Sequence, residues 1–82
     1  MISVYPNPVE KITTVSITSA EKSIVDLSIT DATGKLLRRQ TVNLKAGSNP
    51  ISLNLTHFAT GTYFLQLRNR LNELRTISLI KL

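Results

Sequence analysis

The sequence predicts an all-β fold of short antiparallel strands, packed as a β-sandwich or closed as a barrel. Polar and apolar side chains alternate along most of the chain, as they do in strands with one face in water. Turn-forming residues recur about every 10–15 residues, and a helical period is hard to find. A chain of 82 residues has the size of one small domain. We therefore expect residues 1–82 to form a single domain.

The N-terminal half contains four expected strands. The first, Ile2–Val4, is a short edge strand that stops at Pro6, because proline has no N–H for a sheet hydrogen bond. The longer strands Ile12–Thr18 and Ser23–Thr30 follow, and Lys35–Leu44 returns beside the second of them. The alternation puts these apolar side chains on inner faces: Val15, Ile17, Val25, Leu27 and Ile29.

The C-terminal half contains three expected strands, Asn49–Leu55, Thr62–Arg68 and Arg75–Leu82. Most chains finish in a few loose polar residues. Here the last two strands form a hairpin that runs to Leu82, so this end either closes the domain or is read by another molecule. The expected inner residues are Ile51, Leu53, Leu55, Tyr63, Leu65, Leu67, Ile77 and Leu79.

Short polar segments separate these strands, namely Ser19–Lys22, Asp31–Gly34, Lys45–Ser48, Thr56–Thr60 and Asn69–Asn72. Gly34 is free to take a positive φ in a hairpin turn, and Asp31 is expected to bond the backbone of that turn. Lysine and arginine near strand ends protect sheet edges, but association of two copies through an exposed edge stays open.

The composition excludes several classes of protein. The chain has no cysteine, so it forms no disulfide or thiolate metal site. It lacks a run of about 18 apolar residues, so no membrane insertion by a helix is expected. Its net charge of +5 suits nucleic acid, anionic lipid or an acidic partner, and charge alone does not choose among them. A solvated basic surface is the simpler interpretation.

No residue pattern indicates an enzyme, a metal site or a cofactor. His57 is the one histidine, and no acid lies near it in the sequence, so a catalytic triad is not expected. The five acidic residues are scattered, and the three glycines form no phosphate-binding loop. Phe64 lies beside Gln66 and Arg68, but we expect it to pack or contact a protein rather than stack on nucleic acid.

Five motifs follow one another along the chain: Val4–Pro8 (VYPNP), Asp31–Lys35 (DATGK), Gly47–Leu53 (GSNPISL), Gly61–Leu67 (GTYFLQL) and Ile77–Lys81 (ISLIK). Each is weak alone, but their order and spacing are specific. Together they resemble the type A C-terminal sorting domain of the type IX (Por) secretion system, over essentially the whole chain. The sequence departs from many members at Phe58–Gly61 and at Leu82, which follows the usual terminal lysine or arginine.

The resemblance implies a seven-stranded Ig-like sandwich that acts as a non-enzymatic secretion signal. It also implies a larger parent protein of the Bacteroidota, which enters the periplasm through a cleavable signal peptide. The type IX translocon then recognises the domain and carries the parent across the outer membrane. A sortase-like protease usually removes the domain at the cell surface and attaches the cargo to anionic lipopolysaccharide.

The resemblance places recognition largely in the last two strands, Gly61–Leu82. A terminal edge strand offers unpaired backbone groups to a partner's strand. The expected presented strand comprises Ile77, Ser78, Leu79, Ile80, Lys81 and Leu82, and the residues expected to shape the hairpin are Gly61 and Tyr63. The motif of Tyr5, Pro6, Asn7 and Pro8 marks the start of the domain, as a rigid turn or as a second recognised element.

Two other functions fit the same fold. A carbohydrate-binding or adhesive module would need a row of exposed aromatic side chains, for which Phe58 and Phe64 are the candidates. A fibronectin-like spacer would need no recognition surface at all. Moving the domain onto a reporter separates the spacer from the secretion signal, because a spacer does not redirect export.

Overall fold

The computed structural model describes residues 2–82, which form seven strands and no helix, and so contain no helix that spans a membrane. The strands are β1 (Ile2–Tyr5), β2 (Ile12–Ser19), β3 (Ser23–Asp31), β4 (Leu36–Leu44), β5 (Gly47–Asn54), β6 (Gly61–Asn69) and β7 (Leu74–Lys81). The predicted all-β fold is confirmed. The alternation predicts the strands because each has one face towards the core and one face towards water.

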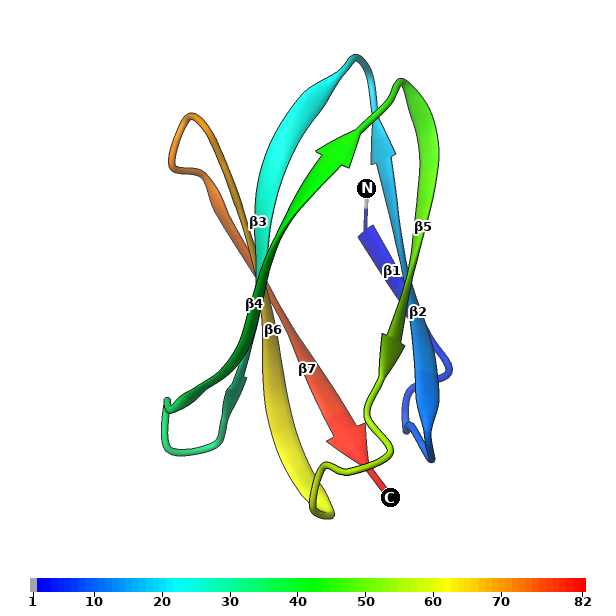
Figure 1. Cartoon of the computed structure of the whole chain (residues 1–82), viewed down its shortest axis with the longest axis vertical. Helices are drawn as coiled ribbons and strands as arrows, with labels where there is room; N and C mark the ends of the chain where they lie inside the picture. The colour runs from blue at the N-terminus through cyan, green and yellow to red at the C-terminus, as the bar shows by residue number, and fades with distance from the viewer. Residues whose placement is uncertain (1) are drawn as a thin grey trace.

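The strands form two sheets that face each other as a sandwich (Figure 1). One sheet has the order β1-β2-β5 and the other the order β4-β3-β6-β7, with every neighbouring pair antiparallel. The hairpins β3–β4 and β6–β7 lie within the larger sheet, and the chain crosses between sheets after β2, β4 and β5. This is the immunoglobulin-like arrangement rather than a closed barrel.

The core lies between the two inner faces. Leu27, Ile29 and Leu65 from the larger sheet are fully buried, and Val15 and Leu53 face them from the smaller one. Every inner residue expected from the alternation belongs to this cluster, although Ile51 and Ile77 are only partly buried. Val9, which precedes β2, is also fully buried and packs at the edge of the sandwich.

The strand after the third turn begins earlier than expected. The sequence predicted a turn over Lys45–Ser48, but β5 starts at Gly47, which pairs with Ser19. The buried Asn49 explains the difference, because its amide donates to the carbonyls of Ile17, Lys45 and Gly47. These bonds hold the chain in a tight bend, so the turn is shorter than expected. Gly47 has the positive φ, 102°, that the bend requires.

The turn between β3 and β4 has the predicted chemistry. One carboxylate oxygen of Asp31 accepts hydrogen bonds from the Thr33 hydroxyl and from the backbone N–H groups of Thr33 and Lys35. These bonds, that of the Thr33 hydroxyl first, hold the pKa of Asp31 below its ordinary value. Gly34 takes a φ of 90° and closes the turn, so both predictions for this segment are confirmed.

Candidate functional site

The β6–β7 hairpin puts the end of the chain at the rim of the larger sheet. β7 pairs with β6 from Arg68↔Leu74 to Gly61↔Lys81, and no further strand of the described residues joins its outer side along the sheet. The predicted hairpin is therefore present, with its last strand at an edge. Gly61 starts β6 and lies directly opposite Lys81, so this pair is the last one of the hairpin, at the end away from its turn.

The side chains of the expected presented strand divide into two sets. Leu79 is fully buried, Lys81 is 7% exposed and Ile77 is partly buried, because these residues face the core. Ser78, Ile80 and Leu82 are exposed, the last two by 48% and 56%. In the folded domain, only this second set offers its side chains to a partner.

The motif that opens the domain covers part of this edge. The Asn7 amide donates to the carbonyl of Ser78 at 3.0 Å, and its oxygen accepts the N–H of Ile80 at 3.1 Å. Val9 continues the cover in parallel, since its N–H donates to the carbonyl of Ile80 and its carbonyl accepts the N–H of Leu82. The C-terminal half of β7 is therefore already paired on its outer side.

The other residues of that motif serve the turn. Tyr5, Pro6 and Pro8 are exposed, and the Pro6 carbonyl accepts a hydrogen bond from the buried Thr13 hydroxyl at 2.9 Å. Sequence reasoning placed a domain boundary here but missed the bonds from Asn7 to β7. No signal in the sequence pointed to them, because the partners lie 71 and 73 positions away.

Tyr63 fixes the beginning of β6. Its buried ring packs against Phe58 at 5.2 Å between centroids, and its hydroxyl donates to the carbonyl of Ala59 in the preceding connection. A tyrosine near the start of this strand that bonds back to the chain is a recurrent feature of immunoglobulin-like sandwiches. Tyr63 thus positions the hairpin from inside and does not itself form part of the outer surface.

Arg38 joins the two sheets on the side away from β7. Its guanidinium donates to the carbonyl of Asn54 at 3.2 Å and lies 5.3 Å from the centre of the Phe58 ring. Phe58 is therefore held between Arg38 and Tyr63. Phe64 is half-buried on the outer face of the sheet, so the two phenylalanines do not form the exposed row that a sugar-binding module would need.

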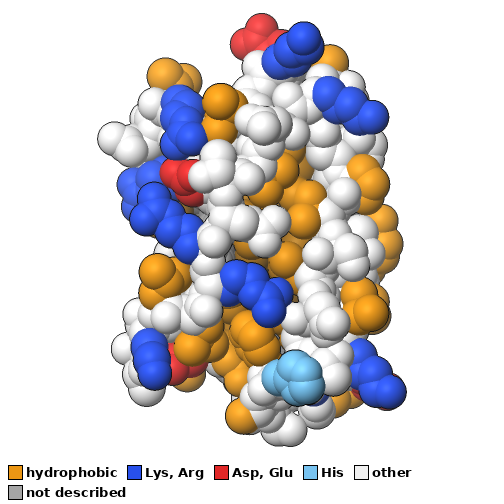
Figure 2. Space-filling model, viewed as in Figure 1, with side chains coloured by type: hydrophobic (Ala, Val, Ile, Leu, Met, Phe, Trp, Pro, Cys, Tyr) orange, Lys and Arg blue, Asp and Glu red, His pale blue; other side chains and the backbone are white. Residues whose placement is uncertain are grey.

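Basic side chains gather around one acid on the outer face of the larger sheet (Figure 2). Asp26 accepts hydrogen bonds from the Thr41 hydroxyl and from Arg70, and Arg39 lies 3.9 Å away. The Thr41 bond, followed by that of Arg70, holds the pKa of Asp26 below its ordinary value. Two arginines share this one carboxylate, which leaves the surface around it with an excess of positive charge.

The fold does not gather the histidine and the acidic residues of the described chain into one site. His57 is exposed in the connection before β6. Among residues 2–82, no three histidine or acidic side chains gather as metal ligands would. What the fold does bring together is the start of the domain and its last strand, at one edge of the larger sheet.

The comparison with protein families matches nearly the whole chain. The sequence profile of the family described as "Secretion system C-terminal sorting domain" matches residues 3–81. The comparison with the curated proteins finds no match. Among solved structures, a β-glucosidase from Listeria innocua in complex with glucose is similar at 14% identity and a TM-score of 0.48, and the match covers 99% of this chain but 16% of that enzyme.

Proposed function

The chain belongs to the family of type IX secretion C-terminal sorting domains, and we propose that the type IX translocon recognises its β6–β7 hairpin to carry a parent protein across the outer membrane. A sorting domain of this kind directs export to the cell surface or secretion as part of that parent, and the family is not a catalytic one. The parent passes through the periplasm before this step. A sortase-like protease then removes the domain and attaches the cargo to anionic lipopolysaccharide.

The exposed row on β7 carries this proposal. Ser78, Ile80 and Leu82 stand in sequence along the outer face, and two of them are large apolar side chains about half in water. Neighbouring exposed apolar side chains on one face are suited to contact with another protein, because burial there removes apolar surface from water. The buried Leu79 and Lys81 keep a role in the proposal, because they fix the strand that holds this row.

The proposal also accounts for the surface charge. The ten lysines and arginines outnumber the five acids, and most of them are exposed on the described chain. A basic domain meets an acidic partner faster than a neutral one does, because charge steers the encounter. The basic outer face of the larger sheet borders β7, so this attraction acts beside the hairpin.

A pair of matched double variants tests the exposed row. In a reporter that carries the domain in a type IX-competent bacterium, Ile80→Ser with Leu82→Ser is expected to reduce delivery to the medium and cell surface at least about tenfold, because lost apolar burial at an interface costs a few kcal/mol. Export is measured by fractionation and immunoblotting. The expected physical cause is weaker binding, so the reporter accumulates in the periplasm.

The control replaces apolar side chains of equal exposure elsewhere. Ile12 and Leu36 are 53% and 52% exposed, close to the values for Ile80 and Leu82, and they lie on β2 and β4. Ile12→Ser with Leu36→Ser is expected to leave export unchanged. Equal export of the two double variants would contradict recognition through this row, provided that both melt near the temperature of the unsubstituted domain.

A further inference from the structure

The four edge strands of the sandwich, β1, β5, β4 and β7, are protected in different ways. At the edge of the smaller sheet, β5 contains Pro50, which has no N–H to donate, and β1 is only four residues long. β4 carries Arg38 and Arg39, and its pairing with β3 is interrupted by an irregularity at Ile29/Thr30. On β7, Asn7 and Val9 already cover the C-terminal half. On this strand, the stretch Leu74–Ser78 remains open.

The open stretch presents backbone groups in a fixed register. The backbone N–H and C=O of Ile80 point away from β6, where they bond to Asn7 and Val9. In an antiparallel pair these groups alternate in direction along a strand, so the backbone groups of Ser78, Thr76 and Leu74 also point away from β6. Within residues 2–82, nothing bonds to the N–H of Ser78 or to the N–H and carbonyl of Thr76 on that side. These groups continue the row to which the chain has already added Val9.

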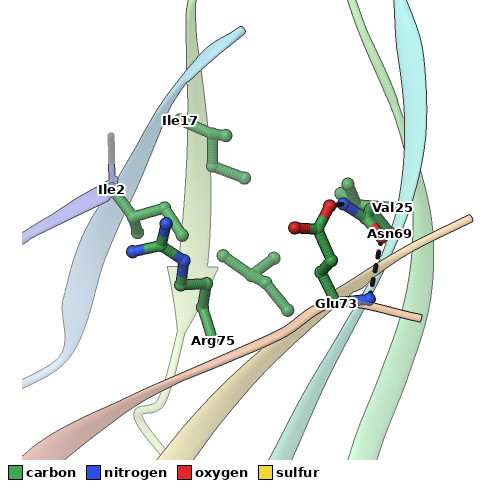
Figure 3. Close-up of a pocket in the computed structure, with 7 residues that line it drawn as sticks. Ile2, Ile17, Val25, Asn69, Glu73 and Arg75 are labelled. Atoms are coloured by element: carbon green, nitrogen blue, oxygen red, sulfur yellow. Dashed lines mark hydrogen bonds between the residues drawn. The ribbon is translucent and has the colours of Figure 1, made fainter. Parts of the chain in front are cut away.

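A pocket opens beside this stretch, between β1 and β7 (Figure 3). Apolar side chains from both sheets, including Ile17 and Val25, line its interior together with Asn69 and Glu73, and Arg75 extends from β7 towards Ile2. Its volume is about 150 Å³, which is the size of a cavity that holds a benzene ring. One leucine or phenylalanine side chain from an added strand therefore fits into it.

The charges at this edge favour an acidic occupant. Arg75 lines the pocket, is exposed and forms no ion pair with another described residue. Glu73, the acid at the pocket mouth, accepts a hydrogen bond from the Asn69 amide at 2.8 Å. A strand with a carboxylate beside its apolar residue thus finds Arg75 and a largely apolar pocket at one edge.

We propose that Leu74–Ser78 is a docking edge for an extended segment of a partner protein, which adds to β7 as a strand, inserts one large apolar side chain into the pocket and meets Arg75 with an acidic residue. Strand addition supplies main-chain hydrogen bonds, and the pocket supplies side-chain specificity. The docking edge differs from the exposed row of Ser78, Ile80 and Leu82, which contacts the partner through side chains on the outer face. The identification of the partner as a component of the secretion machinery rests on the proposed function.

A proline substitution tests the edge without touching the β6–β7 ladder. Thr76→Pro removes an outward N–H, and the native Pro50 on β5 shows that an edge strand of this fold accepts proline. In the reporter assay, Thr76→Pro is expected to reduce export at least about tenfold, through loss of a backbone bond and obstruction of the added strand. Asn43→Pro, at an outward position on the edge strand β4, is the matched control and is expected to export normally.

A second variant leaves the backbone intact. Arg75→Glu reverses the charge at the pocket mouth, and Lys22→Glu makes the same change of net charge in the exposed loop before β3. Arg75→Glu is expected to reduce export at least about tenfold, and Lys22→Glu by less than about twofold. Normal export of both Thr76→Pro and Arg75→Glu overturns the docking edge. Failure of the unsubstituted domain to export the reporter instead overturns the proposed function, so the two failures are distinguishable.

Discussion

Replacement of Leu65 by alanine is expected to lower the free energy of unfolding by about 2–5 kcal/mol. Leu65 is fully buried in β6, between β3 and β7, where it pairs with Ile29 and Ile77. The substitution removes apolar contacts and leaves a cavity that the flanking strands cannot close, because both are held in register. A domain of 82 residues has a total stability of roughly 4–12 kcal/mol, so this loss is a large part of it.

Urea unfolding followed by circular dichroism measures this effect. The matched control is Leu36→Ala, since Leu36 is 52% exposed at the start of β4 and is expected to change stability by less than about 0.5 kcal/mol. The chain contains no tryptophan, so the far-ultraviolet signal of the sheets is the suitable probe. Similar unfolding midpoints for the two variants would mean that Leu65 does not lie in the core described above.

Removal of Thr76–Leu82 from the parent protein is expected to leave the cargo in the periplasm. The deletion takes away most of β7, and with it the buried Leu79, the exposed row and most of the docking edge. It also uncovers the outer side of β6 and leaves Asn7 and Val9 without their partners. Immunoblotting of the periplasm, the cell surface and the medium measures the distribution, and normal surface delivery of the truncated parent would contradict the account.

The deletion acts on folding and recognition together, so a folding control is needed. The Leu65→Ala domain is weakened but keeps the whole outer surface of β7. At a temperature where circular dichroism shows this variant folded, its export is expected to remain near that of the unsubstituted domain. Retention of the truncated parent, together with export of the Leu65→Ala variant, assigns the effect to the lost strand rather than to reduced stability.

The strands could be predicted because each follows a simple period. Val25, Leu27 and Ile29 alternate with polar residues, and Tyr63, Leu65 and Leu67 recur at every second position, so the inner faces of β3 and β6 were evident from the sequence. The turn at Asp31 was also predictable, because an aspartate that begins a four-residue turn bonds to the backbone just ahead of it. These features depend on neighbours in the sequence.

Features that depend on distant partners could not be predicted. The bonds from Asn7 to Ser78 and Ile80 join the two ends of the chain, and no local pattern encodes them. Lys81 was expected in the presented strand, but its inward position buries most of the side chain, with its amine bonded to the carbonyl of Leu82. A long side chain at the end of a strand can bury its stem in this way.

The contact between the two ends of the chain covers part of the last strand. The sequence suggested an edge that is open to its final residue, whereas Asn7 and Val9 occupy the outer side of Ile80. We therefore propose that recognition of the folded domain is divided between an outer face, with Ile80 and Leu82, and the open stretch Leu74–Ser78. This division arises because Asn7 and Val9 bond only to the C-terminal part of β7 and leave the outward backbone groups before it open.

Transfer of residues 1–82 to an unrelated periplasmic reporter tests the central claim most directly. In a bacterium with the type IX machinery, the fused reporter is expected to reach the cell surface or the medium, and to stay in the periplasm in a strain that lacks the translocon. The same fusion without Thr76–Leu82 is expected to stay in the periplasm of both strains. A complete domain that folds on the reporter and leaves it in the periplasm of the competent strain would contradict the claim that this sandwich is a sorting signal.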